Sequence, residues 1–294
     1  MNKVGFIGVG IMGKSMVRNL MKAGFELHIY ARTKSKVEDV ISEGAQFHES
    51  IKDCVQDCDA VITIVGFPQD VEEVYFDEGN ILDSAKEGAY LIDMTTTSPQ
   101  IAEKIYAEGT KRGFHVMDAP VTGGDTGAKA GTLSILVGGE KEDYEACMPL
   151  FEAMGTNINY HGKAGCGQHC KLANQIMIAG TLSGVCEALT YAKEQGLDPE
   201  VFMKSVATGA AGSKQLDTFG PKILKDDYAP GFFMKHFIKD MKLALIEANR
   251  KGLSLDVLSM VLANYEELEQ EGYGDLGTQA LMKFYDEEHR NTEE

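Results

Sequence analysis

Short apolar runs alternate with helical patterns along the first half of the chain. Runs rich in β-branched and other apolar residues predict strands over residues 4–7, 27–30, 60–65, 90–93, 115–119, 133–137 and 157–161. The run over 60–65, AVITIV, offers apolar side chains to both faces. The intervening segments predict helices, the first ending near Gly24 and the second near Gly44. Strands that are buried on both faces and separated by helices indicate a mostly parallel sheet.

The strand signal ends after residue 163, and the remainder is helical by pattern. Helices are predicted over 167–195, 198–210, 234–251, 254–271 and 275–289. Ser98 and Asp198 are capping residues that each precede a proline, which marks two helix starts. We therefore expect an α/β domain over 1–163 and an all-helical domain over 164–294, with a long helix at about 167–195. The acidic end, 286–294, is interpreted as a frayed helix end.

Composition and charge narrow the class of protein. The chain has 294 residues, enough for one large or two ordinary domains, and a net charge of -17. Nucleic acid is excluded as a partner by this charge, because phosphate backbones bind to basic surfaces. The first residues enter a strand directly, without the apolar segment of a signal peptide. The longest uncharged stretch, 172–186, is short for a bilayer span, so we expect a soluble, cytoplasmic protein.

The six cysteines do not suggest a disulfide framework. None forms a C-x-x-C pair, and reduced thiols are expected. Cys166, His169 and Cys170 lie close in sequence, but their spacing matches no zinc pattern and a fourth ligand is missing. We expect no metal site.

The first turn carries a G-x-G-x-x-G pattern between a predicted strand and a predicted helix. In a dinucleotide site the first glycine permits a tight turn, the second admits a pyrophosphate and the third lets helix and sheet approach. The helix N-terminus then offers free N–H groups to the phosphates. A glycine-rich turn without a ligand is the alternative. The residues that would bind the cofactor here are Gly8, Val9, Gly10, Ile11, Met12 and Gly13.

The end of the second predicted strand bears on the choice of cofactor. An NAD site usually has Asp or Glu there, on the ribose 2′-hydroxyl. This chain has Arg32, Thr33 and Lys34 instead. Guanidinium binds phosphate in a bidentate manner, so the sequence predicts NADP, with NAD still possible. The alternative is that Arg32 is only a solvated surface charge.

A second anion site is predicted beyond the strand that ends near Ala119. Thr122, Gly123 and Gly124 follow it, and ligands of open α/β sheets bind beyond the carboxyl ends of strands. Backbone N–H groups at the glycines and the threonine hydroxyl would form a carboxylate cradle. Taken alone, these residues are more typical of a plain turn.

A lysine begins the long uncharged helix. Lys171 and Asn174 are three residues apart and so share a face, among apolar neighbours. Such an environment is expected to lower the pKa of Lys171 towards ~7–8, which suits proton transfer, and a second cation at Lys239 would lower that pKa further. The alternative is a lysine that extends along the helix to solvent.

Four segments taken together identify a family resemblance that covers essentially the whole chain. The segments GFIGVGIMGKSMVRNLMKAG, DAPVTGGDTGAKAGTLSILVGG, GQHCKLANQ and FIKDMKLAL occur in order and at fitting distances. They resemble the β-hydroxyacid dehydrogenases, which include 3-hydroxyisobutyrate dehydrogenase, tartronate semialdehyde reductase and the glyoxylate/succinic semialdehyde reductases. The resemblance implies an N-terminal Rossmann doubly wound sheet, an all-α domain like that of 6-phosphogluconate dehydrogenase, and a homodimer or homotetramer.

The resemblance also implies roles for individual residues. Lys171 matches the catalytic lysine, and Asn174 the asparagine that orients the substrate. Ala31 and Gln175 depart from residues common in the family, which leaves the substrate open. The other matches are the substrate-carboxylate loop Thr122, Gly123 and Gly124, Lys239 near the nicotinamide with its acidic neighbour Asp240, and the cofactor-side residues Phe67, Pro68 and Thr96. Phe232 is a candidate substrate-binding residue on which the size of the pocket would depend.

The activity expected from these features is hydride transfer between NADP(H) and a small β-hydroxy acid or semialdehyde acid. Glyoxylate, succinic semialdehyde, tartronate semialdehyde and 3-hydroxyisobutyrate all remain candidates. An imine reductase of the same fold is one alternative, but those enzymes commonly carry another residue at the lysine position. A non-catalytic NADP-binding module is the other alternative, and the presence of Lys171, Asn174 and Lys239 argues against it.

Overall fold

The computed structural model describes residues 1–285. The chain divides into two compact units, Met1–Lys171 and Leu172–Glu294. The segment 286–294, for which a frayed helix end is predicted, lies outside the described residues.

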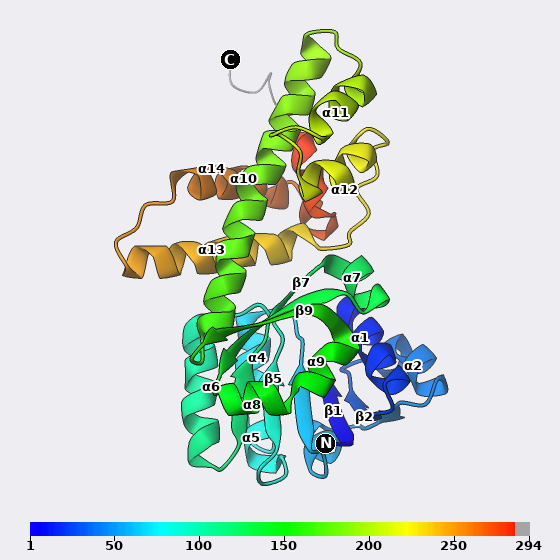
Figure 1. Cartoon of the computed structure of the whole chain (residues 1–294), viewed down its shortest axis with the longest axis vertical. Coiled ribbons are helices and arrows are strands. Elements are labelled where there is room, and N and C mark those ends of the chain that lie inside the picture. The colour runs from blue at the N-terminus through cyan, green and yellow to red at the C-terminus, as the bar shows by residue number, and fades with distance from the viewer. Residues whose placement is uncertain (286–294) are drawn as a thin grey trace. The chain divides into compact units, whose positions relative to one another are not determined.

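The first unit is built on one sheet, which has nine strands within residues 1–285 (Figure 1). Its order is β3-β2-β1-β4-β5-β6-β8-β7, with β9 paired to β8. Strands β1 to β6 are parallel, and β8 runs antiparallel to β6 and β7, so the predicted α/β class with a mostly parallel sheet is confirmed. The strands are β1 (Lys3–Ile7), β2 (Glu26–Tyr30), β3 (Gln46–Phe47), β4 (Ala60–Thr63), β5 (Tyr90–Asp93), β6 (His115–Asp118), β7 (Val121–Thr122), β8 (Leu133–Gly139) and β9 (Gly155–Gly162).

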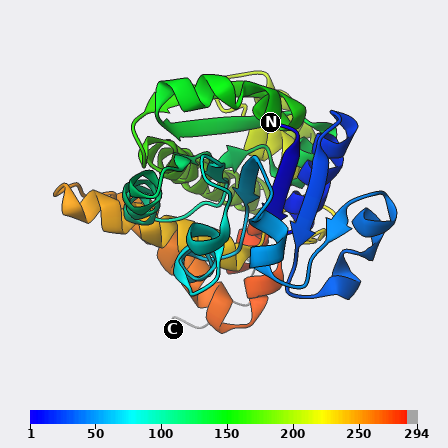
Figure 2. The ribbon, with the colours of Figure 1, turned by 90° about the horizontal axis from the view of Figure 1, so that it is seen from below.

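Helices cover both faces of this sheet (Figures 1 and 2). Successive strand residues point to opposite faces, and in β4 Ala60 and Ile62 join one core while Val61 joins the other. One core contains apolar residues of α1 (Ile11–Lys22), α2 (Glu38–Ser42), α7 (Gly124–Ala130) and α9 (Met148–Met154). The other contains residues of α3 (Ile51–Val55), α4 (Pro68–Phe76), α5 (Ile81–Ser84) and α6 (Pro99–Lys111), and α8 (Lys141–Ala146) completes the unit.

Several element boundaries differ from the predictions. The strand predicted over 60–65 ends at Thr63, because the Val65 N–H donates to the hydroxyl of Thr95 (3.0 Å) instead of to a strand. Strands β3 and β7 have two residues each, which is too short to leave an apolar pattern. The helix predicted to end near Gly44 is divided into a 3₁₀ turn, Lys34–Lys36, and α2.

The second unit is helical, as predicted, and has a single apolar core. Its helices are α10 (Cys166–Glu194), which starts in the first unit, α11 (Pro199–Ala207), α12 (Lys214–Ile223), α13 (Met234–Arg250) and α14 (Asp256–Gln270). The prediction of an α-helix over 275–289 is wrong for its described part, residues 275–285. Residues Tyr273–Asp275 and Thr278–Tyr285 are 3₁₀ turns, because the Gln279 amide donates to the carbonyls of Asp227 and Ala229 and fixes this backbone.

Helix α10 is the most apolar of the long helices. By length and composition alone it is able to cross a membrane. That is a weak indication, because a helix in the core of a globular unit can be equally long and apolar. Of the most apolar 18-residue stretch of α10, 44% is buried. Leu172, Leu182 and Leu189 of this helix lie in the core of the second unit.

The start of α10 is fixed to the sheet by one carboxylate. Asp118, the last residue of β6, accepts hydrogen bonds from the N–H groups of Gly165 (2.7 Å) and Gln168 (2.8 Å). These donors belong to the helix N-terminus, where N–H groups lack helical partners and negative charge is favoured. Burial raises the pKa of Asp118, and the backbone N–H groups oppose that rise.

Glycine makes this close approach possible. A Cβ on Gly167 would lie 2.3 Å from the carbonyl oxygen of Leu136 and 2.8 Å from that of Asp118. A Cβ on Gly138 would lie 2.6 Å from the Asp118 carboxylate. The helix therefore touches strand β8 and the end of β6 with bare backbone.

The substitution Gly167→Ala is expected to lower the free energy of unfolding by about 1–3 kcal/mol, because overpacking against backbone atoms cannot relax cheaply. The matched control is Gly184→Ala, on an exposed face of the same helix, where an added Cβ meets nothing within 4 Å. That change should stabilise the protein by up to ~1 kcal/mol, since alanine is the better helix former. Urea unfolding of both variants measures the difference, and equal stabilities would contradict the contact described.

Candidate active site at the carboxyl edge of the sheet

In the glycine-rich turn between β1 and α1, two glycines are required by contacts within the chain and a third is not. Gly8 has a φ of 97°, and a Cβ there would lie 2.1 Å from the carbonyl oxygen of Ile64. A Cβ on Gly13 would lie 2.2 Å from the carbonyl oxygen of Gly8. Gly10 is different: its φ is -87°, and an added Cβ meets nothing within 4 Å. Within residues 1–285 no contact requires a glycine at position 10, which favours the close approach of a ligand.

The same turn has the features of an anion site. Gly10 is the N-cap of α1, and no side chain of the described residues caps that helix. Its first turn also holds no acidic residue. Val9 is buried, Met12 packs against the core and Ile11 is half exposed. The turn therefore presents backbone N–H groups and a positive helix end at the carboxyl edge of β1.

The basic residues after β2 are already paired with carboxylates. Arg32 donates to Asp70 (3.2 Å), although 74% of the Arg32 side chain is exposed. Asp70 also accepts from the N–H of Phe67 (2.9 Å) and so fixes the Phe67-Pro68 start of α4. Arg32 and the Phe67-Pro68 loop, predicted separately, are therefore brought together by an aspartate that no sequence motif singles out.

Lys34 and Thr33 lie in the same loop. Lys34 forms an ion pair with Glu49 (3.2 Å), and its ammonium lies 4.8 Å from the centre of the Phe47 ring. Thr33 precedes the 3₁₀ turn in an extended conformation. A phosphate bound here would have to compete with these carboxylates for the cations.

The loop after β5 is supported by a buried aspartate. Asp93 accepts hydrogen bonds from the hydroxyl of Thr63 (2.8 Å) and the N–H of Thr95 (3.1 Å). Burial raises the pKa of Asp93 to about 6. Thr95 and Thr97 are buried, whereas the predicted cofactor residue Thr96 between them is partly exposed. The loop is thus fixed on its buried side by Asp93, and Thr96 is its accessible residue.

The predicted carboxylate cradle follows β7, the last strand in the sheet order of the first unit. Thr122 ends β7 and pairs with Ser134 of β8. Gly123 and Gly124 follow with φ values of 134° and 66°, in the region that favours glycine. Both glycines are exposed, and an added Cβ on Gly124 meets nothing within 4 Å. The turn therefore has free space at Gly124, whereas Gly123 packs against Leu133.

Lys171 lies one helical turn after Gln168 on the anchored start of α10. Its exposed fraction is 7%, so the lysine does not extend into solvent as the alternative interpretation held. The side chain of Gln168 is fully buried and bonds to the loop after β5: its NH₂ group donates to the Thr95 carbonyl (2.7 Å), and its carbonyl accepts from the Thr97 N–H (3.0 Å). Lys171 is therefore on the helix turn that is attached to the ends of β5 and β6.

The remaining predicted residues form a network within the second unit. The amide of Asn174 donates to Gln175 (2.9 Å), and the amide of Gln175 donates to Asp240 (2.7 Å). Lys239 forms an ion pair with Asp240 (3.1 Å), whose exposed fraction is 1%. The ring of Phe232 packs against those of His236 and Phe237. Asn174 and Lys239, far apart in the sequence, are connected through two buried residues.

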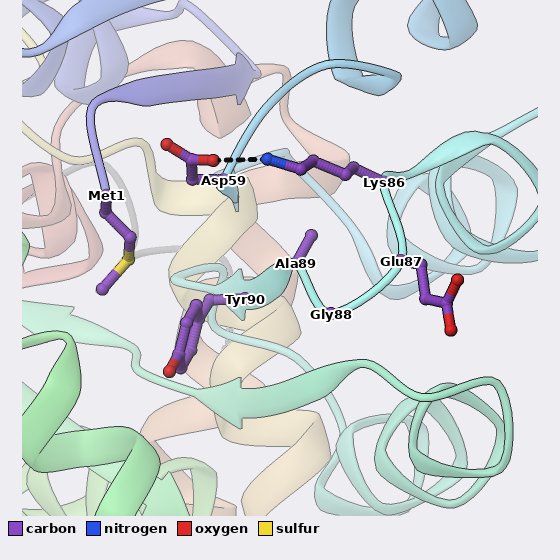
Figure 3. Close-up of a pocket in the computed structure, with 7 residues that line it drawn as sticks. All are labelled: Met1, Asp59, Lys86, Glu87, Gly88, Ala89 and Tyr90. Atoms are coloured by element: carbon purple, nitrogen blue, oxygen red, sulfur yellow. Dashed lines mark hydrogen bonds and ion pairs between the residues drawn. The ribbon is translucent and has the colours of Figure 1, made fainter.

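A hollow at the opposite edge of the sheet is shown in Figure 3. Met1, Asp59, Lys86 and Tyr90 line it, at the amino ends of β1, β4 and β5. Both carboxylate oxygens of Asp59 already have partners: one pairs with Lys86 (2.8 Å), and the other accepts from the N–H groups of Asn2 and Lys3. Ligands of open α/β sheets bind at the carboxyl edge, so this hollow is not the candidate site.

Among residues 1–285, no group of three or more His, Cys, Asp or Glu side chains is placed to hold a metal ion. The cysteines of that part of the chain form no disulfide. Burial raises the pKa of Cys170, beside Lys171.

Two family models together match almost the whole chain. Residues 3–162 match the NAD binding domain of 6-phosphogluconate dehydrogenase. Residues 165–285 match the NAD-binding model of NADP-dependent 3-hydroxyisobutyrate dehydrogenase.

Individual relatives agree with these matches. The chain is 49% identical to YkwC, an uncharacterized oxidoreductase of Bacillus subtilis, over 96% of this chain and 98% of that protein. It is 37% identical to the 2-hydroxy-3-oxopropionate reductase of Escherichia coli, with 86% of each chain covered. A 3-hydroxyisobutyrate dehydrogenase of Mycobacterium tuberculosis, solved with L-serine, superposes with a TM-score of 0.87 at 26% identity, over 96% of this chain and 98% of that one. The chain therefore belongs to the β-hydroxyacid dehydrogenase family of oxidoreductases.

Proposed function

We propose that this oxidoreductase transfers a hydride between NADP(H) and a small β-hydroxy acid or semialdehyde acid. The observation that carries the proposal is the placement of a buried lysine, Lys171, on a helix attached to the carboxyl edge of a Rossmann sheet. General acid–base catalysis needs a proton donor that is held within reach of the reacting carbonyl and shielded from water. A buried lysine without such a task is uncommon, because burying an ammonium group costs free energy.

The residues at the first turn fit a dinucleotide. Gly10 leaves room for a pyrophosphate, and the start of α1 offers N–H groups to it. Phe67, Pro68 and Thr96 would flank the rest of the cofactor at the ends of β4 and β5. The nicotinamide supplies or accepts the hydride when it is bound.

The protein's own residues would then bind the substrate and move the proton. The N–H groups of Gly123 and Gly124 and the Thr122 hydroxyl bind the substrate carboxylate. In reduction the Lys171 ammonium protonates the carbonyl oxygen, and in oxidation the neutral amine accepts the hydroxyl proton. The family relationship assigns the orientation of the substrate to Asn174, whose amide donates to Gln175, and further substrate contacts to Lys239 and Phe232.

The substrate class follows from the proposed roles of the carboxylate cradle and of Lys171. A carboxylate cradle and a single proton donor suit two- to five-carbon acids that bear an aldehyde, keto or hydroxyl group. Glyoxylate, succinic semialdehyde, tartronate semialdehyde and 3-hydroxyisobutyrate all belong to that class. The relative from Escherichia coli, named for 2-hydroxy-3-oxopropionate, supports the tartronate semialdehyde end of the range. A cytoplasmic location and a homodimer or homotetramer are part of the same proposal, the oligomer being what the family resemblance implies.

Lys171→Ala is expected to reduce kcat for the best aldehyde acid by about 10²-fold or more, because the general acid is lost. Affinity for NADPH should stay unchanged. The control is Lys193→Ala, which removes an exposed lysine from the other end of α10. Steady-state NADPH oxidation with a panel of aldehyde acids measures the effect, and undiminished turnover by the first variant would refute the role of Lys171.

Gly10→Ala is expected to weaken NADPH binding by about tenfold or more while leaving thermal stability nearly unchanged, because only the ligand would meet the added methyl. Gly13→Ala should instead lower stability by about 1–3 kcal/mol, since its Cβ would overlap the Gly8 carbonyl. The chain has no tryptophan, so the emission of bound NADPH can be titrated without a tryptophan background. A stability loss in Gly10→Ala, or normal binding by it, would argue against a pyrophosphate at this turn.

Arg32→Ala is expected to lower kcat/KM with NADPH by about tenfold and to leave kcat/KM with NADH within about twofold, because a charge-assisted bond to the 2′-phosphate is lost. Lys52→Ala, which removes an exposed lysine of α3, is the matched control. Initial rates with the two cofactors measure the ratio. An equal fall with both cofactors would show that Arg32 does not read the phosphate.

A further inference from the structure

Gln168 is a fully buried residue that links three separate segments of the first unit. Its side-chain amide donates to the Thr95 carbonyl (2.7 Å), and its side-chain carbonyl accepts from the Thr97 N–H (3.0 Å). Its backbone N–H donates to the Asp118 carboxylate (2.8 Å). Both polar atoms of the side chain are used, and both partners are backbone groups.

The two side-chain bonds bracket Thr96. They pair with the residues before and after it, as a neighbouring strand would pair with an extended segment. Thr95 and Thr97 are buried as a result, and Thr96 is the accessible residue of the three. The position of Thr96 therefore depends on the amide of a residue on another element.

The loop held by Gln168 is hydrogen-bonded to a second loop, the one after β4. The Thr95 hydroxyl accepts from the N–H of Val65, beyond the end of β4. The N–H of Thr95 donates to the buried Asp93. A displacement of the Thr95 backbone would thus be transmitted to the ends of both β4 and β5, the edge at which the proposed cofactor lies.

Gln168 also has a fixed relation to Lys171. The two residues are three apart on α10 and so lie on the same face, one turn from each other. The helix start itself stays anchored through Asp118, whose partners are backbone N–H groups that no substitution at position 168 removes except by proline. A change in the side chain of Gln168 would release the loop and leave the helix in place.

We infer that Gln168 is a positioning residue of the proposed reaction: it holds the loop Thr95–Thr97 at a fixed distance from the helix turn that carries Lys171. This inference rests on the proposed function. It assigns to Gln168 the alignment of the nicotinamide with the proton donor, without contact to either. The task requires a side chain in which one atom donates and the other accepts, as the two atoms of an amide do.

The test compares Gln168→Leu with Gln168→Glu. The leucine variant lacks both side-chain bonds, and kcat at saturating cofactor and substrate is expected to fall by about tenfold or more, because small misplacements of reacting groups are costly. The KM for the acid should stay within about twofold, since Thr122, Gly123 and Gly124 are not attached to this loop. The primary isotope effect with 4-deuterated NADPH should rise, because hydride transfer becomes slower relative to the other steps.

The Gln168→Glu variant supplies a readout that a general structural defect would not give. When its new carboxyl is protonated, that group retains one donor and one acceptor, whereas the ionised carboxylate faces the Thr95 carbonyl without a donor. Burial raises the pKa of such a carboxyl, so kcat of this variant relative to the wild type should recover as the pH is lowered. The leucine variant should show no such recovery.

Controls separate the possible failures. Gln195→Leu changes an exposed glutamine just after the same helix and should behave as the wild type. A fall in kcat with unchanged isotope effect and no recovery of Gln168→Glu at low pH would mean only a smaller active fraction, and would overturn the inference. If Gln168→Leu does not fold, the pH response of Gln168→Glu decides alone. A wild type that turns over no aldehyde acid would overturn the proposed function and this inference together, whereas an active wild type with a normal Gln168→Leu overturns the inference only.

Discussion

The carboxylate of Asp118 at the N-terminus of α10 is the interaction on which the candidate site depends. It joins the end of a buried strand to the helix that carries Lys171, through two N–H donors that a helix start leaves without partners. Removing a carboxylate from water is costly, and here backbone N–H groups and the helix dipole offset part of that cost. The bare backbone of Gly138 and Gly167 provides the space. Together with the bonds of the Gln168 side chain, this junction defines the position of the lysine relative to the sheet.

The glycines of the chain divide into those that the fold requires and those that it does not. A Cβ on Gly8 would lie 2.1 Å from one carbonyl oxygen and a Cβ on Gly13 would lie 2.2 Å from another, distances that exclude any side chain. Gly10 lies in open space with an ordinary φ, in the same turn. An alanine at position 10 would cost the folded protein little, so the motif makes physical sense only with a partner from outside the chain. This contrast is a stronger argument for a dinucleotide than the spacing of the motif.

The alternation of apolar runs predicted most of the fold, because buried parallel strands and amphipathic helices leave strong local patterns. It failed over the described residues 278–285, where the bonds from Gln279 to distant carbonyls determine a 3₁₀ backbone that no local pattern records. The candidate site shows the same division. Lys171 and the glycine turn are visible in sequence, whereas Asp118, Gln168 and Asp70 act through partners tens of residues away. Only the folded chain reveals that a buried glutamine brackets Thr96.

An acidic chain with a net charge of -17 is proposed to bind two anions, and the local structure shows how that is feasible. The anion sites rely on backbone N–H groups at Gly10, Gly123 and Gly124, whose partial charges are fixed in place and need no counter-charge. The cations at the end of β2 are in a different situation, since Arg32 and Lys34 already have Asp70 and Glu49 as partners. A 2′-phosphate would compete for the guanidinium with Asp70, which also caps the Phe67-Pro68 start of α4. The proposed choice of NADP over NAD therefore depends on how two anions compete for one exposed arginine, and that competition is coupled to the loop that would lie beside the cofactor.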